Sequence, residues 1–132
     1  KVGLTVSLNA ADNKTRDFLM PINRRYPLEN LHQALAGFPL PSRRMITIAY
    51  VLLKEVNDSE RHARQLTRFL SGLRCKVNLI PFNPYPGAQF EMPEEDRILA
   101  FKDVLVRKHY TAIIRWSKGR EISAACGQLA AT

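Results

Sequence analysis

Short apolar runs alternate along the chain with segments of helical periodicity, and this alternation constrains the fold more than any other feature. Residues 2–8 alternate apolar and polar side chains, residues 45–53 are apolar and rich in β-branched residues, and residues 77–81 and 111–116 are similar short runs. We expect all four segments to be strands. Helices between consecutive strands require parallel pairing and right-handed crossovers, so the sequence predicts an α/β fold.

Capping signals mark the helices expected between these strands. Asp12 suits the N-cap of a short helix that Pro21 stops, and Gly37 and Gly72 suit the ends of the next two. The acidic residues 94–96 favour the start of a long fourth helix. Apolar stripes at helical spacing complete the pattern: Leu28, Leu31 and Leu35; Ala63, Leu66 and Leu70; Ile98, Phe101 and Leu105.

The chain has 132 residues, which is the length of one domain. Four strands are too few for a closed (β/α)₈ barrel of about 250 residues, so half of such a barrel and a small open sheet both remain possible. In either architecture ligands bind at the carboxyl ends of the strands. Polar residues gather at those ends, in residues 7–9, 53–57, 81–83 and 115–116.

The net charge of +8 favours a polyanionic partner, with nucleic acid the first candidate and an acidic protein or a membrane surface the next. Two groups of basic residues are candidate RNA contacts: Arg61, Arg64 and Arg68 on one side of an expected helix, and Arg115, Lys118 and Arg120 near the C-terminus. A solvated basic face explains the first group equally well.

The sequence lacks the features of a secreted, membrane or metal-binding protein. No apolar run approaches the ~20 residues of a membrane span, and no signal peptide is visible. Two cysteines make no disulfide framework, so we expect reduced thiols in a cytoplasmic protein. The three histidines have no ligand-like spacing, and we expect no metal site.

Cys126 has the surroundings of a reactive thiol. Small residues flank it (Ala124, Ala125 and Gly127), and basic residues precede it, an environment that lowers the pKa of a thiol. Composition alone favours the opposite interpretation, because a free cysteine is usually a small buried hydrophobic residue. We apply that interpretation to Cys75, which precedes a core strand.

Several motifs together resemble one enzyme family. They are residues 7–10 (Ser-Leu-Asn-Ala), 19–23 (Leu-Met-Pro-Ile-Asn), 75–84 (Cys-Lys-Val-Asn-Leu-Ile-Pro-Phe-Asn-Pro) and 124–129 (Ala-Ala-Cys-Gly-Gln-Leu), with 50–53 and 56–58 between them. In this order and spacing the chain resembles the C-terminal half of the radical S-adenosylmethionine (SAM) methyltransferases that modify adenine in ribosomal and transfer RNA.

The resemblance implies a fold and a set of site residues. The fold is half of a radical SAM barrel, with about four parallel strands and flanking helices, formed by residues 1–132 as one piece of a larger domain. SAM would be contacted by Ser7, Leu8 and Asn9, which match a Ser-Leu-His motif, and by Asn83. Turn formation before Pro84 is the alternative role for Asn83.

The resemblance also implies a mechanism. Cys126 matches the family cysteine that accepts a methyl group from one SAM, and a radical made from a second SAM activates that methyl group for addition to carbon 2 of adenine. A thiolate accepts a methyl group readily, whereas the adenine carbon is not nucleophilic. Related enzymes act on carbon 8 instead, and the motifs do not distinguish the two.

The full-length enzymes carry SAM and a 4Fe-4S cluster, whose cysteine motif lies upstream of the matching region. We therefore expect no bound cofactor and no activity for this chain alone. Asn9, Ala49 and residues 120–123 depart from the family pattern, and the effect of these departures is open.

Two other interpretations remain. The chain could be a basic α/β module that binds RNA without catalysis. A half-barrel also leaves a strand edge and an apolar sheet face unpaired, so we expect the isolated chain to self-associate.

Overall fold

The computed structural model describes residues 4–41 and 44–116. Strands and helices alternate as the sequence predicts, with one additional 3₁₀ turn, η1, after the first helix. The elements are β1 (Thr5–Ser7), α1 (Asn13–Leu19), η1 (Pro21–Arg24), α2 (Leu28–Ala36), β2 (Ile46–Leu52), α3 (Glu60–Leu70), β3 (Cys75–Pro81), α4 (Glu95–Arg107) and β4 (Thr111–Ile114).

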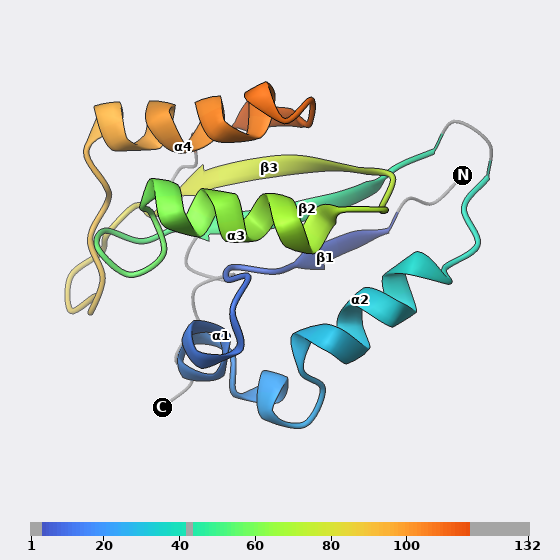
Figure 1. Cartoon of the computed structure of the whole chain (residues 1–132). Coiled ribbons are helices and arrows are strands. Elements are labelled where there is room, and N and C mark those ends of the chain that lie inside the picture. The colour runs from blue at the N-terminus through green and yellow to red at the C-terminus, as the bar shows by residue number, and fades with distance from the viewer. Residues whose placement is uncertain (1–3, 42–43, 117–132) are drawn as a thin grey trace.

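The four strands form one parallel sheet in the order β1-β2-β3-β4. Figure 1 shows β1, β2 and β3 side by side. Each strand therefore pairs with its neighbour in the sequence, through a helical crossover. The predicted α/β class with about four parallel strands is confirmed.

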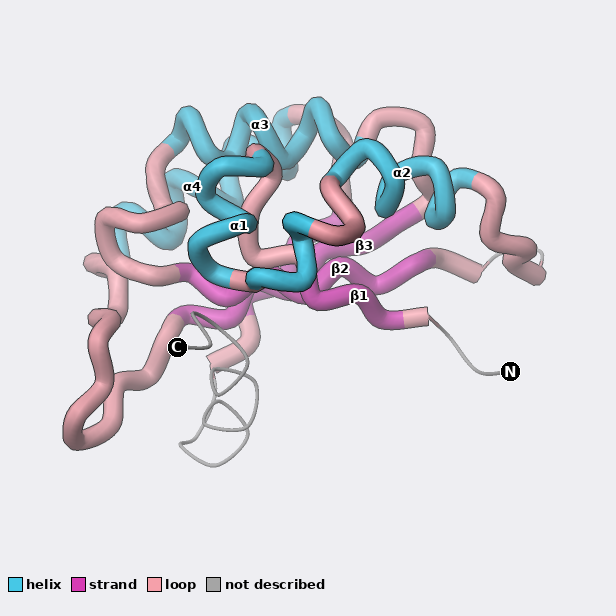
Figure 2. The backbone as a smooth tube through the Cα atoms, turned by 90° about the horizontal axis from the view of Figure 1, so that it is seen from below, coloured by secondary structure: helices cyan, strands magenta, loops and turns pink. Residues whose placement is uncertain are grey.

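Helices α2, α3 and α4 lie on the same side of the sheet (Figure 2). Alternate strand residues point to that side, among them Ile48, Tyr50, Val77 and Leu79, which are fully buried. They pack against the predicted apolar stripes of the helices, and the rings of Tyr50 and Phe101 lie 5.1 Å apart. This one-sided core accounts for most of the buried apolar surface, which is the main favourable term in folding.

The opposite face of the sheet carries no helix in the described part of the chain (Figure 2). Toward the amino ends of the strands its residues are mostly polar or small: Thr5, Ser7, Thr47, Ala49, Lys76, Asn78, Thr111 and Ile113. Toward the carboxyl ends it continues with the apolar Val51 and Ile80, which belong to a second, smaller apolar cluster. We call this surface the open face. Most apolar residues of these strands alternate toward the helices, so the apolar part of the open face is limited to Val51, Ile80 and Ile113. Self-association of the chain stays a prediction.

Two helix starts show why the local predictions succeed. The Asp12 side chain accepts a hydrogen bond from the Thr15 amide at 2.9 Å and so caps α1. Ser59 and His62 form a reciprocal capping box at the start of α3. Gly72 follows α3 with φ of +85°, a conformation that favours glycine.

Candidate functional site

Ser7 is the last residue of β1, so it lies at the carboxyl end of the sheet, and its side chain is on the open face. The sheet register aligns Ser7 with Ala49, Asn78 and Ile113 in one row across the open face. Ser7 is exposed and Asn78 is half-buried. Neighbouring strands lie about 4.8 Å apart. Ser7 and Asn78 lie on either side of Ala49, so their side chains are roughly 10 Å from each other, a separation that suits a polar ligand.

Asn83 lies two residues beyond the end of β3 and is half-buried. It follows Phe82, which is fully buried in a second, smaller core at the carboxyl end of the sheet. The structure thus brings Ser7 and Asn83 to the same edge of the sheet from β1 and β3, as the sequence predicts for strand ends.

Leu8 and Asn9 are placed differently from Ser7. The Leu8 side chain is fully buried in the core on the helix side, and its amide donates to the Ala49 carbonyl at 2.9 Å. Asn9 is 4% exposed and has φ of +62°, a left-handed conformation that asparagine tolerates. Its Oδ1 accepts from the Val51 amide at 2.8 Å. Both residues therefore shape the end of β1, whereas Ser7 presents its side chain on the open face.

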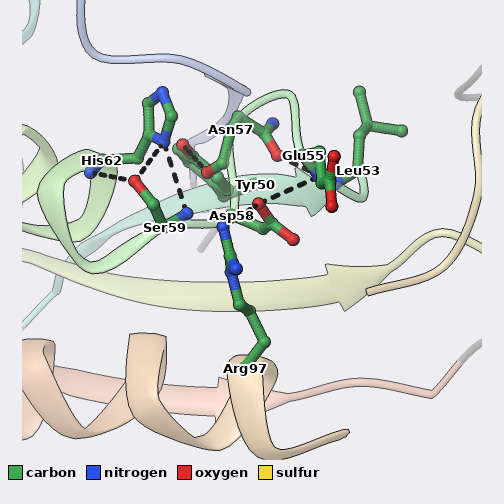
Figure 3. Close-up of polar contacts among 8 residues, drawn as sticks. All are labelled: Tyr50, Leu53, Glu55, Asn57, Asp58, Ser59, His62 and Arg97. Atoms are coloured by element: carbon green, nitrogen blue, oxygen red, sulfur yellow. Dashed lines mark hydrogen bonds and ion pairs between the residues drawn. The ribbon is translucent and has the colours of Figure 1, made fainter. Parts of the chain in front are cut away.

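Asn57 joins the ends of β1 and β2 from the connection that leads to α3. Figure 3 shows it beside Tyr50 and Leu53. It is fully buried, and its Nδ2 donates to the carbonyls of Asn9 and Val51, both at 2.8 Å. Its Oδ1 accepts from the Leu53 amide at 2.8 Å, and its own carbonyl accepts from the Tyr50 hydroxyl at 2.9 Å. The amide is thus satisfied on both sides, as a buried polar group requires.

Asp58 continues this polar network toward α4. It is 2% exposed, and its Oδ1 accepts from the Glu55 amide at 3.0 Å and from Arg97 at 3.4 Å (Figure 3). Glu55 has φ of +59°, so the Asp58 carboxylate supports a tight, strained turn at the end of β2. Burial raises the pKa of Tyr50 well above its ordinary value, so its hydroxyl remains a proton donor to Asn57.

Arg16 contacts the backbone of the candidate site, and the sequence did not predict this contact. Its side chain lies beneath the end of β1 and bonds to the carbonyls of Ser7 and Leu8. Asn23, which is fully buried in η1, accepts a further bond from it. The only signal in the sequence was the motif at residues 19–23, which carries Asn23 but gives no indication of its partner.

A cluster of three phenylalanine side chains, Phe18, Phe82 and Phe90, lines the carboxyl end of the sheet. The rings of Phe18 and Phe90 lie 6.5 Å apart edge to face, and Phe90 contacts Phe82 in the same way at 6.0 Å. Beside them is a hollow of about 360 Å³ that Lys54 and Glu91 also line. The loop after β3 therefore walls one side of the strand ends.

The predicted RNA contacts separate into two places. Arg61, Arg64 and Arg68 are exposed on α3, on the helix side of the sheet and away from Ser7. We call these three residues the α3 arginine stripe. Arg115 is exposed directly after β4, at the carboxyl edge. Lys118 and Arg120 lie outside the described residues, as does the predicted catalytic Cys126.

Cys75 has the buried packing role predicted for it. It is 4% exposed at the start of β3, and burial raises the pKa of its thiol to about 11. Within residues 4–41 and 44–116, no group of histidine, cysteine or acidic side chains could hold a metal ion. The same residues contain no helix long and apolar enough to cross a membrane.

No protein-family model matches the chain. It is 53% identical over 128 residues to the dual-specificity RNA methyltransferase RlmN of Syntrophus aciditrophicus, covering 97% of this chain and 37% of that protein. The RlmN of Desulfosudis oleivorans is 55% identical over 130 residues, covering 98% and 35%. The chain thus spans little more than a third of the length of these relatives.

Two solved structures resemble the fold. A radical SAM methyltransferase from Sphaerobacter thermophilus superimposes on the whole chain with a TM-score of 0.86 and 45% identity, over 39% of its own length. A domain of a pyruvate-formate lyase-activating enzyme from Bacteroides vulgatus matches 85% of the chain with a TM-score of 0.61. At 18% identity, the second likeness concerns the fold alone.

Proposed function

This chain is homologous over nearly all its length to a segment of the radical SAM RNA methyltransferases of the RlmN type, and on that premise we propose that it forms the C-terminal part of the barrel of such an enzyme. The proposed substrate is an adenine of ribosomal or transfer RNA, methylated at carbon 2. SAM and a 4Fe-4S cluster are the cofactors that this activity requires. The position of Ser7 on the open face, at the carboxyl end of a parallel half-barrel, is the observation that carries the proposal.

The residues around Ser7 suit part of a SAM site. SAM offers amino, carboxylate and ribose groups, for which hydroxyl and amide side chains supply both donors and acceptors. Ser7 and Asn83 would hold the cofactor, while Leu8 and Asn9 shape the strand end beneath it. When bound, SAM supplies the methyl group. The chain has only two cysteines, too few for a three-cysteine cluster motif, so no step is assigned here to the cluster.

Cys126 is the proposed methyl carrier. A thiolate is the side chain best suited to accept a methyl group, and Arg115, Lys118 and Arg120 precede it in the sequence, where positive charge favours the thiolate. Peptide mass spectrometry of the protein purified from its natural source should show one added methylene group on the Cys126 peptide. Unmodified Cys126 in protein that methylates RNA would contradict this role.

Binding of S-adenosylhomocysteine to the full-length enzyme that contains this segment, measured by isothermal titration calorimetry, tests the cofactor site. Ser7→Ala should weaken binding by about five- to tenfold, the value of roughly one hydrogen bond. Thr5→Ala is the matched control, because Thr5 is also an exposed hydroxyl on β1 but lies farther from the carboxyl end. Equal effects of the two substitutions would refute the assignment of Ser7.

A non-catalytic RNA-binding module is the second candidate. The exposed α3 arginine stripe favours it, since three arginines on one helix face suit phosphate contacts. RNA binding that depends on the stripe and is indifferent to Cys126→Ala and Ser7→Ala would favour this candidate over the enzyme.

A further inference from the structure

We propose that Arg16 is a positioning residue for the cofactor site, which fixes the peptide groups of Ser7 and Leu8 so that the Ser7 hydroxyl stays aimed at the open face. The inference rests on the proposed function, because it concerns the serine that we assign to SAM. Arg16 itself lies on α1, on the side of the strand end away from the ligand.

Three hydrogen bonds hold the guanidinium group in one orientation. Nε donates to the Leu8 carbonyl at 2.9 Å, Nη2 donates to the Ser7 carbonyl at 3.1 Å, and Nη1 donates to Asn23 Oδ1 at 3.0 Å. Two successive carbonyls are thus held by one planar group. Lysine carries the same charge but lacks this rigid fork of donors, so it cannot reproduce the arrangement.

The point of contact is where β1 leaves the sheet. The Thr47 amide donates to the Leu4 carbonyl, and two further steps of two residues along the parallel ladder would bring the Val51 amide to the Leu8 carbonyl. The Val51 amide is instead bonded to the Asn9 side chain. Arg16 takes up the Leu8 carbonyl that the ladder leaves, and so ends the strand directly after Ser7.

Burial of Arg16 supports a fixed role. The residue is 5% exposed, and no carboxylate among the described residues forms an ion pair with it. Burial lowers the pKa of the guanidinium, which shows that the charged form is held at a cost in hydration. A buried charge bonded to neutral carbonyls is expensive for stability alone.

A second layer of contacts holds Asn23 in place. Its Nδ2 donates to Asp17 at 2.7 Å and to Asn13 Oδ1 at 3.0 Å. Asn13 Oδ1 also accepts from the Leu28 amide at the start of α2. The orientation of Arg16 is therefore tied to α1, η1 and α2 together, and these elements fix the strand end on which Ser7 sits.

Amide hydrogen exchange of the chain, followed by NMR, tests the positioning role without any ligand. Arg16→Lys and Arg16→Ala should each speed exchange at Leu8 and Val51 at least tenfold more than at Leu79 in β3. Millimolar methylguanidinium should restore the protection in Arg16→Ala. Lys14→Ala, an exposed basic residue of the same helix, is the control and should change nothing. A uniform change, or protection that methylguanidinium does not restore, would overturn the inference.

Asn23→Ala keeps the arginine but removes one of its acceptors, so it serves if the Arg16 variants do not fold. It should produce the same local loss of protection to a smaller degree. Unchanged exchange at Leu8 in a folded Asn23→Ala protein, together with unfolded Arg16 variants, would overturn the inference as well.

Affinity for S-adenosylhomocysteine separates this inference from the proposed function. The Arg16 variants should bind it about tenfold more weakly, and methylguanidinium should restore the affinity of Arg16→Ala. Full affinity in variants whose strand end exchanges faster would reduce Arg16 to a purely structural residue and refute the inference. Absence of binding by the unaltered full-length enzyme that contains this segment would instead count against the proposed cofactor site, and hydrogen exchange alone would then decide the role of Arg16.

Discussion

Replacement of Asn57 by alanine should destabilise the protein more than any other single polar-to-alanine change in the β2–α3 connection. The side chain is fully buried and makes three hydrogen bonds, to the Leu53 amide and to the carbonyls of Asn9 and Val51. Alanine removes all three bonds but leaves the three backbone groups in place. These groups become buried polar atoms without a partner.

The cost follows from the number of groups left without a partner. A buried donor or acceptor without a partner costs about 1–3 kcal/mol, and relaxation of the connection toward solvent recovers part of it. Three such groups give a loss of about 3–5 kcal/mol in the free energy of unfolding. Because a domain of this size is stable by only about 5–15 kcal/mol, the variant should lose a large fraction of its stability.

Urea unfolding monitored by circular dichroism at several protein concentrations provides the measurement. Asn30→Ala is the matched control, because Asn30 is an exposed asparagine within α2 and alanine has the higher helix propensity. Its free energy of unfolding should change by less than about 0.5 kcal/mol. If Asn57→Ala lost no more stability than Asn30→Ala, the view that Asn57 joins the two strand ends would be refuted.

Three further predictions concern titration and charge. Burial and the nearby Arg61 charge lower the pKa of His62. The stability that neutral His62 contributes should therefore be complete above the ordinary histidine pKa and decline as the pH falls through the lowered value, and urea unfolding should show that His62→Gln weakens this dependence. Burial raises the pKa of Cys75 from 9.0 to about 11. The stability that the protonated thiol contributes should therefore be complete below pH 9 and be lost as the pH rises toward 11. Alkylation at pH 8, mapped by mass spectrometry, should spare Cys75 in the folded protein. Alanine substitution of the α3 arginine stripe should make the slope of log binding constant against log salt concentration for RNA shallower by about two. An unchanged slope would mean that the three arginines are solvated and do not contact RNA.

Local signals account for the parts of the fold that were predicted correctly. Asp12 caps α1 through a residue three positions away, and Ser59 and His62 form a box at the same spacing. Gly72 likewise ends α3 in the positive-φ conformation that glycine favours. Such relationships are contained within a few consecutive residues, so a single sequence reveals them.

The missed parts depend on distant partners. Asn9 bonds to Val51, which is 42 residues away, and Asn57 bonds to Asn9 across 48 residues. The Asn9 side chain takes the place of a strand partner for the Val51 amide, a role that the motif does not indicate, and its contact with the cofactor stays a prediction. The bonds of Arg16 require the chain to turn back beneath β1, which no local pattern indicates.

The order of the strands in the sheet repeats their order in the chain, and this has a consequence for how the protein folds during synthesis. Each new strand adds to the one made immediately before it, and each crossover helix covers a surface that already exists. Folding can therefore advance from β1 toward β4 as the ribosome releases the chain, with no strand waiting for a distant partner. The crossover from β1 to β2 is the longest of the three, so we expect this pairing to be the slowest closure. The bonds of Arg16 need only the chain up to η1, whereas those of Asn57 form once the β2–α3 connection is made.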